Sequence, residues 1–316
     1  MKSIRSFSPA LALSIAACAS AKTQGSAAAP STTAAVSSIA AKTGGMERRD
    51  GFIPLYLDSK QGKIFLELPR DSMHALMFVT LATGLGSNPI GLDRGSGGDS
   101  YVARFDRNGD RVLVVFENWN YRTSAANNPD HARTVLEAFP PSTPGSLPII
   151  AQEGGRLVVD ATDFVMRDWN DVTGTLTASN EGSYAVARDR SSVYRAYTKA
   201  FPENTEVDVA LTFATQGKPG QTIAQIVPDG KSFTLRQHLS FVQLPDNGYQ
   251  PRALDPRTGF FGITFNDYAQ PIQFPLEQRW IMRHRLERVN PGDPNSPIKN
   301  PLVYYIDRGI PEPIRT

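Results

Sequence analysis

The chain has very few of the residues that build the commonest metal and redox sites. It contains one cysteine, Cys18, and 4 histidines in 316 residues. A single cysteine excludes an internal disulfide and a cysteine-based zinc site. No two of His74, His131, His238 and His284 are four residues apart, so the chain lacks the HExxH pattern that holds zinc on one helix face. We therefore predict no metal ligand and no cofactor in this chain.

Motifs of two large enzyme classes are also absent. The chain has no G-x-S-x-G sequence, which positions the nucleophile of many serine hydrolases. The glycine-rich stretch 83–98 has Pro89 where a dinucleotide-binding turn needs its third glycine. We predict no catalytic residue. An alternative is a hydrolase that uses the closely spaced carboxylates Asp160, Asp163 and Asp168 as an acid/base pair, although turn chemistry explains them equally well.

The charge is nearly balanced, with 33 basic and 31 acidic residues and a formal net charge of +2. Such a balance provides no electrostatic reason to expect nucleic acid as a partner. Hydrophobic residues make up 40% of the chain, which is enough for a core, and the length suits one large or two ordinary domains. We expect a folded, globular protein.

The N-terminus is typical of an export signal. Lys2 and Arg5 precede an apolar run, 9–17, that is too short to span a bilayer. Cys18 closes an Ile-Ala-Ala-Cys sequence similar to the bacterial lipobox, in which the cysteine is diacylated and becomes the mature N-terminus. The alternative is ordinary signal-peptide cleavage after Ala21. Both interpretations predict a protein of the periplasm or outer membrane, and the first adds a lipid anchor at Cys18.

A tether is expected to follow the export signal of residues 1–18. Residues 19–45 are rich in Ala, Ser, Thr and Gly and have almost no large apolar side chain. Such a segment cannot bury enough surface to offset the entropy cost of ordering. We predict that 19–45 is disordered and holds the next domain away from the membrane.

From Met46 onward, short runs with β character alternate with turns rich in Gly, Pro, Asn and Asp. The clearest hairpin surrounds Asn108-Gly109, a dipeptide that favours tight hairpin turns. A helix is expected over 130–139, and 160–167 is either a strand end or a short helix. The runs with β character are 52–57, 63–68, 76–82, 101–105, 111–116, 157–160, 207–213, 233–244 and 260–265. This pattern predicts a mainly β fold of antiparallel sandwich or barrel-like sheets with a few short helices.

Two further strands are expected near the end of the chain. The segment 276–289 alternates as a strand would, and its arginines (Arg279, Arg283, Arg285 and Arg288) are interpreted as a solvated face. The run Leu302–Ile306 is apolar, aromatic and β-branched, which favours a buried strand. We expect it to pair with 280–286.

Two loops are candidates for binding, because long loops often carry function. They are 83–98 and 246–259. The candidate binding residues in them are Asn88, Asp93, Arg94, Asp246, Tyr249 and Arg252.

Several stretches together resemble a known protein region. They are GFIPLYLD at 51–58, ATGLGSNPIGLDRG at 82–95, RQHLSFVQLPDNGYQPRALDPRTGFF at 236–261, and 301–315. Collinearly over 46–316, the chain is similar to the amino-terminal region of a bacterial family of large exported zinc-dependent metalloproteases. In that family a β-rich domain of unassigned function precedes a metzincin-like catalytic domain with an extended HExxH motif. None of those motif residues has a counterpart here.

The resemblance implies a non-catalytic module that acts as a pro-domain, scaffold or binding domain and is inactive alone. Residues 46–300 would form the β-rich domain, and 301–316 the first strand of a protease domain missing from this chain, as in a truncated or split member. Zinc would be bound only in the catalytic domain, which would be the partner in cis or in trans. A stand-alone cell-envelope lipoprotein that binds peptide or glycan is the alternative.

Overall fold

The computed structural model describes residues 38–69, 72–125, 127–246, 248–307 and 309–315. All of the described residues belong to one compact unit, Val36–Thr316. The predicted export signal, its Cys18 and most of the predicted tether therefore lie outside the described residues.

The described chain is mainly β, with 37% strand and 13% helix. The strands of the large sheet are β1 (Glu47–Arg49), β2 (Leu55–Asp58), β3 (Lys63–Leu68), β4 (Met73–Leu81), β5 (Gly97–Asn108), β6 (Arg111–Phe116), β8 (Ser142–Glu153), β9 (Arg156–Asp160), β10 (Ala185–Val186), β11 (Ser192–Val193), β12 (Lys199–Ala200), β13 (Asn204–Ala214) and β14 (Ser232–Val242). A smaller sheet contains β7 (Tyr121–Arg122), β15 (Gly262–Asp267) and β16 (Glu277–Ile281). The helices are α1 (Ile39–Thr43), α2 (Pro129–Ala138), α3 (Thr162–Val165), α4 (Val172–Ala178) and α5 (Gln221–Ile226). None of the helices in the described ranges is long and apolar enough to cross a membrane.

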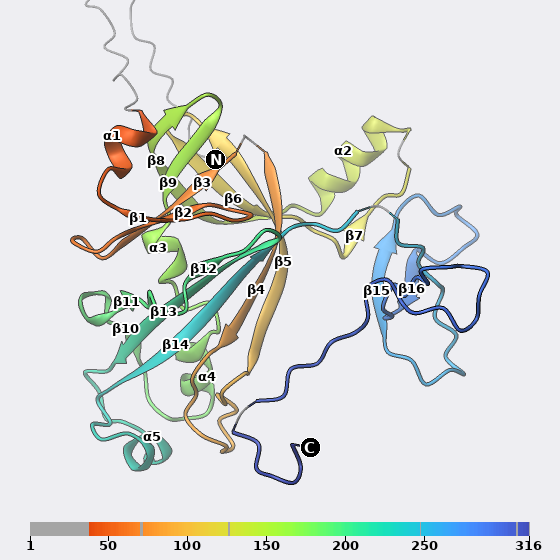
Figure 1. Ribbon diagram of the computed structural model, residues 1–316. Coiled ribbons are helices and arrows are strands. Elements are labelled where there is room, and N and C mark those ends of the chain that lie inside the picture. Colours follow the sequence, from red (N-terminus) through yellow and green to blue (C-terminus); the bar gives the residue numbers. More distant parts are fainter. Residues whose placement is uncertain (1–37, 70–71, 126, 247, 308, 316) are drawn as a thin grey trace, which may run out of the picture. The chain divides into compact units, whose positions relative to one another are not determined.

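The large sheet has 13 antiparallel strands (Figure 1). Its order is β1-β2-β3-β9-β8-β6-β5-β4-β14-β13-β10, with β11 and β12 also paired to β13. The sheet curls into a nearly closed barrel, which confirms the predicted mainly β, antiparallel and barrel-like fold. Large apolar side chains fill its interior, among them Phe105, Phe213 and Phe241, each at most 1% exposed.

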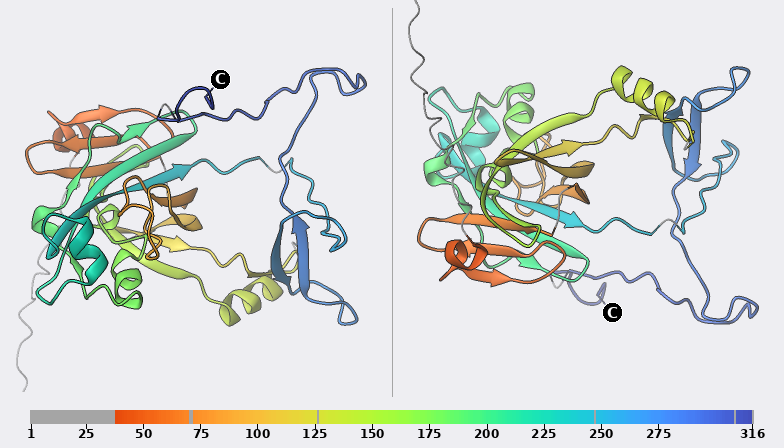
Figure 2. Two further views of the ribbon diagram at one scale, coloured as in Figure 1. Left: turned by 90° about the horizontal axis from the view of Figure 1, so that it is seen from below. Right: turned by 90° about the horizontal axis from the view of Figure 1, so that it is seen from above.

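The two ends of the curled sheet meet next to Gly51. The N–H of Phe52 donates to the carbonyl of Phe201 at 2.7 Å, and the N–H of Ile53 donates to the hydroxyl of Thr205 at 3.0 Å. The views in Figure 2 show the segment β1–β3 beside β12 and β13. A Cβ on Gly51 would lie 2.6 Å from the nitrogen of Phe201, so only glycine allows this approach.

Replacing Gly51 should therefore loosen the closure of the barrel. We expect Gly51→Ala to lower the free energy of unfolding by about 1 to 3 kcal/mol, because the added methyl group overlaps the backbone of Phe201. Urea denaturation measures the effect. The matched control is Gly259→Ala, since a Cβ there meets nothing within 4 Å. Equal stabilities of the two variants would contradict this account of the closure.

Local sequence signals of two elements are confirmed. Helix α2 begins after Asn128, whose side chain accepts the N–H of His131, and Pro129 occupies its first turn. Strands β5 and β6 form the predicted hairpin, but the pair Asn108↔Arg111 places Gly109 and Asp110 in the turn. Gly109 alone of these two has a positive φ, of 63°.

The segment 160–167 contains both expected alternatives. Strand β9 ends at Asp160, and α3 starts two residues later. The side chain of Asp160 accepts the N–H of Thr162 at 3.0 Å, which ends the strand and starts the helical turn.

The prediction of a disordered tether up to residue 45 is wrong for its described end. Residues 39–43 form α1, and Ser38 caps it by accepting the N–H of Ala41. Ile39 is 5% exposed and packs with Tyr56, Phe65 and Val158. One large apolar side chain is thus enough to dock this short helix on the outer face of the barrel sheet.

The predictions for the last two strands need correction. Strand β16 covers only Glu277–Ile281, because its partner β15 begins at Gly262, directly opposite Ile281. Leu302–Ile306 forms no strand, does not pair with 280–286, and is exposed along its whole length. The apolar run favours extended backbone, but among the described residues it finds no neighbouring strand with which to form a ladder.

Candidate functional site

Polar and charged side chains gather on the outer face of β13 and β14. These strands pair with Asp208 opposite His238 and Glu206 opposite Ser240. Successive side chains of a strand point to opposite faces, so Leu239 and Phe241 enter the core while His238 and Ser240 point outward. The register between the two strands therefore creates the cluster.

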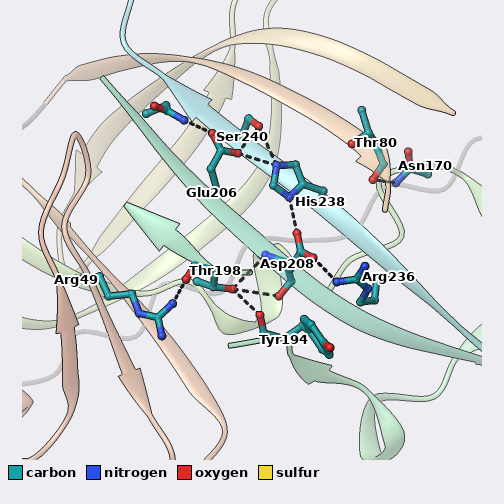
Figure 3. Close-up of polar contacts among 11 residues, drawn as sticks. Arg49, Thr80, Asn170, Tyr194, Thr198, Glu206, Asp208, Arg236, His238 and Ser240 are labelled. Carbon is teal, nitrogen blue, oxygen red and sulfur yellow. Dashed lines mark hydrogen bonds and ion pairs between the residues drawn. The ribbon is translucent and has the colours of Figure 1, made fainter. Parts of the chain in front are cut away.

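His238 lies at the centre of this cluster (Figure 3). Its Nε2 lies 2.7 Å from the carboxylate of Glu206, and its Nδ1 contacts the carboxylate of Asp208. The hydroxyl of Ser240 donates to Glu206 and lies 3.2 Å from Nε2. Both ring nitrogens of His238 thus face carboxylates.

Arg236 completes the cluster on the next outward position of β14. Its Nη1 donates to Asp208 at 3.1 Å, and its guanidinium lies 4.6 Å from the ring centroid of Tyr194 and 4.8 Å from that of Tyr197. The side chain of Asp208 is 3% exposed. A carboxylate this deeply buried requires cationic partners, and His238 and Arg236 supply them.

Thr198 connects the cluster to the closure of the barrel. It is fully buried, and its hydroxyl accepts the N–H of Asp208 at 3.1 Å and donates to the carbonyl of Tyr194 at 3.2 Å. Its own carbonyl accepts from the guanidinium of Arg49, the last residue of β1 (Figure 3). The same residue therefore positions Asp208 and binds the opposite end of the sheet.

The two carboxylates hold His238 in its charged form. Burial opposes the charge, but hydrogen bonds to Asp208 and Glu206 outweigh burial and raise the pKa of His238 from 6.5 to about 9. For Glu206, burial would raise the pKa, yet hydrogen bonds from His238, Ser240 and Asn204 lower it below its usual value. At neutral pH the cluster contains an imidazolium and an ionised carboxylate in direct contact.

This chemistry separates the cluster from a hydrolytic triad. The cluster contains, in spatial order, Ser240, His238 and Asp208, which is the order of nucleophile, base and orienting acid in a triad. A base must be neutral to take the serine proton, whereas His238 is protonated below pH 9 and its Nε2 is bound to Glu206. The arrangement acts as an ion network and not as an activated nucleophile.

A shallow cavity of about 370 Å³ adjoins the network. Besides the ionic residues, Thr80, Tyr197, Lys199 and Phe201 line it, and Arg94 reaches it from the loop before β5. It combines cations with exposed aromatic rings. These groups suit a ligand with a negative charge and an apolar body.

The cluster generates a specific pH dependence of stability. The folded pKa of His238 lies above its unfolded value, so its stabilisation is complete below pH 6.5 and is lost as the pH rises through about 9. We expect the free energy of unfolding of the wild-type chain to be higher than that of His238→Gln at the lower pH. The difference between the two should fall by about 3 kcal/mol between these pH values. Glu206 affects stability at the acidic end of the pH range, because its stabilisation is lost as the pH falls below 4.5.

Urea titrations at a series of pH values provide the measurement. The control is His131→Gln, because His131 lies on α2, outside the network, and its ring contacts the hydroxyl of Thr123. A wild-type profile parallel to that of His238→Gln across this range would show that the network does not hold the charge.

The structure brings only one of the predicted binding residues to this site. Arg94 lines the cavity and pairs with Asp307 at 2.9 Å. Asn88 instead holds its own loop, donating to the carbonyls of Leu85 and Gly86. Asp93 has one buried carboxylate oxygen without a hydrogen-bond partner among the described residues.

The other three predicted binding residues do not line this cavity. Asp246 pairs with Arg285 at 2.5 Å, and the ring of Tyr249 lies 4.8 Å from the guanidinium of Arg283. Arg252 is exposed, and its carbonyl accepts the N–H of Ile281. Two of the arginines interpreted as a solvated face thus anchor the loop 246–259.

The predicted aspartate group does not converge on a common site. Asp160 pairs with Lys63 at 2.9 Å, and Asp163 pairs with Arg188 at 2.5 Å. Asp168 accepts the N–H groups of Val172 and Thr173 at the start of α4. Salt bridging and helix capping account for all three carboxylates.

The described residues do not fit a zinc ion. No group of three or more His, Cys, Asp or Glu side chains within those ranges is arranged to hold a metal. His74 is bound to Glu117 at 3.1 Å, and both nitrogens of His238 face carboxylates.

Inspection of the sequence missed Glu206, Asp208, His238 and Ser240. The signal was present, because the β13 and β14 runs, VDVALTF and FTLRQHLSF, place ionisable residues at alternate positions among apolar ones. A strand buried on one face explains that pattern by itself. What identifies the cluster is the register of one strand against the other.

Fold and site together define an antiparallel β-barrel module with a structural ion network on its surface. Residues 95–288, more than half of the chain, match the family described as a domain of unknown function, DUF5117. The chain belongs to this family. No curated protein and no solved structure matches the chain.

Proposed function

We propose that the chain is a non-catalytic module of an exported zinc-metalloprotease system and that it docks on the catalytic domain in cis or in trans. The observation that supports this proposal is a concentration of exposed apolar side chains late in the chain. Among the described hydrophobic residues after Val242, only Phe265 is buried.

We call these exposed residues, taken together, the C-terminal apolar surface. Phe261 is 85% exposed and Tyr305 is 94% exposed, so neither side chain is part of a hydrophobic core. Exposed apolar groups in such number mark interaction surfaces in soluble proteins. The members are Phe260, Phe261, Ile263, Ile272, Phe274, Leu276, Met282, Leu286, Val289, Leu302, Val303, Tyr304, Tyr305 and Ile306.

A protease domain fits this surface for two reasons. The resemblance over 46–316 is to the region that directly precedes a metzincin-like catalytic domain, and 301–315 is one of the stretches that carry it. The ion network lacks an activated nucleophile, and the described residues hold no metal-binding group. In this proposal the partner supplies zinc and chemistry, and this module shapes, covers or positions the partner's cleft.

The same proposal places the module outside the cytoplasm, in the periplasm or at the outer membrane. The basic, then apolar N-terminus and the Ile-Ala-Ala-Cys sequence ending at Cys18 support export and a lipid anchor. A membrane-tethered module would hold its protease partner close to the envelope.

Binding of a separately produced metzincin-like catalytic domain to the full chain tests the docking proposal. We expect Phe261→Asp and Tyr305→Asp each to weaken the affinity by about tenfold or more, because each removes an aromatic side chain from the buried interface. Calorimetry measures the affinity. Leu136→Asp is the matched control, since Leu136 is an exposed apolar residue on α2, away from this surface in sequence.

Two results would refute the proposal. One is the absence of binding at micromolar concentrations of both proteins. The other is stoichiometric zinc in the purified chain together with chelator-sensitive cleavage of casein, which would show that the chain is itself a metalloprotease.

A further inference from the structure

Strand β5 is paired with β6 along only half of its length. Residues 103–108 pair with β6, whereas Ser100 and Tyr101 pair with β4 alone. After Phe116 the chain turns away, and its last contact with β5 is the N–H of Glu117 donating to the carbonyl of Val102 at 3.0 Å. None of the described strands covers this side of Gly97–Ser100, and Figure 1 shows this half of β5 along the edge of the sheet.

The open edge presents backbone hydrogen-bonding groups to solvent. In an antiparallel strand, alternate residues direct both N–H and C=O to the same neighbour. The carbonyl of Val102 points to the β6 side, so the N–H and C=O of Ser100 point the same way and meet no strand. Residues 97–100 are exposed, and they include no lysine or proline of the kind that protects sheet edges.

A cavity of about 530 Å³ lies beside this edge. Tyr101 and Phe116 stack at 3.9 Å between ring centroids and form part of its lining, to which Phe78 and Trp119 contribute half-exposed rings. Pro140 and Pro141 also line the cavity. Prolines have no N–H to donate, so these two residues cannot complete the ladder on the open side of β5.

The cavity also has an unpaired charge. Asp99 accepts from the hydroxyl of Tyr101 at 3.0 Å and has no cationic partner among the described residues. The other carboxylate in the lining, Glu117, is bound to His74 and Arg104. A ligand with one basic group close to the edge would therefore complement Asp99.

We propose that β5 binds an extended peptide segment of a partner protein, which adds a strand next to Gly97–Ser100. The peptide backbone exchanges hydrogen bonds with Ser100, its alternate apolar side chains enter the aromatic cavity, and a lysine or arginine pairs with Asp99. Strand addition of this kind takes its affinity from backbone hydrogen bonds and its selectivity from alternate side chains. The site goes beyond the proposed docking function, because it involves none of the residues of the C-terminal apolar surface.

A synthetic peptide, acetyl-Lys-Val-Thr-Val-Lys-Val-Thr-amide, is the probe, and calorimetry with the full chain gives its affinity. We expect Ser100→Pro to weaken binding by about tenfold, because it removes the outward N–H. Proline is tolerated at an edge position whose N–H is not part of the ladder, so the barrel should keep its fold. Ser100→Ala keeps the N–H and should change the affinity less than twofold, within the scatter of exposed substitutions.

Two further variants do not depend on the folding of Ser100→Pro. The same peptide with alternate backbone amides N-methylated keeps its side chains but cannot donate to β5, and it should fail to bind. Asp99→Lys should weaken binding of the lysine peptide, and replacing the peptide lysines by glutamate should restore it.

Four outcomes would overturn the proposal. They are no binding of the probe, equal affinities for Ser100→Pro and Ser100→Ala, equal affinities for the methylated and unmethylated peptides, and self-association of the chain that Ser100→Pro abolishes. The last result would assign the edge to a second copy. Binding of an oligosaccharide in place of the peptide, with no sensitivity to Ser100→Pro, would also contradict it.

Discussion

The contact between Gly51–Ile53 and Phe201–Thr205 is the constraint on which the rest of this structure depends. It joins the first strands of the sheet to the last and turns an open antiparallel sheet into a nearly closed barrel. The contact brings the two ends of the sheet together and helps to enclose one continuous apolar core. The outward face of β13 and β14 gains its shape from the same contact, since Arg49 binds Thr198, and Thr198 binds Asp208.

The charged cluster is understood best as a consequence of that architecture. Asp208 sits at a position that closure makes almost inaccessible, and an ionised carboxylate there would be costly without cations. Arg236 and His238 lie on the adjacent strand at the two positions that can reach it. The pairing explains why a histidine on the surface of a barrel is charged at neutral pH.

How much could be predicted from the sequence depended on the range of the interactions involved. The hairpin around Asn108-Gly109 and the helix expected over 130–139 arise from local preferences, and both form, although the turn falls on Gly109 and Asp110 and the helix begins one residue earlier. The ion network required the register of β13 against β14, which no short stretch of sequence specifies. The prediction of a strand at Leu302–Ile306 was wrong because it relied on strand propensity alone. A strand also needs a neighbouring strand to pair with. Ile39 was overlooked since one apolar residue in a polar segment carries no periodic signal.

The closure of the barrel also sets the order of events in folding. Ile53 and Thr205 are 152 positions apart in the chain, so the contact between them carries a large loop-closure entropy and forms slowly compared with hairpins such as β5–β6. During synthesis, the first three strands emerge long before β13 is available. Until then their outer edge stays open to other chains, and the risk of aggregation is highest. The barrel is therefore a fold that a chain can complete only when nearly all of its domain has been synthesised.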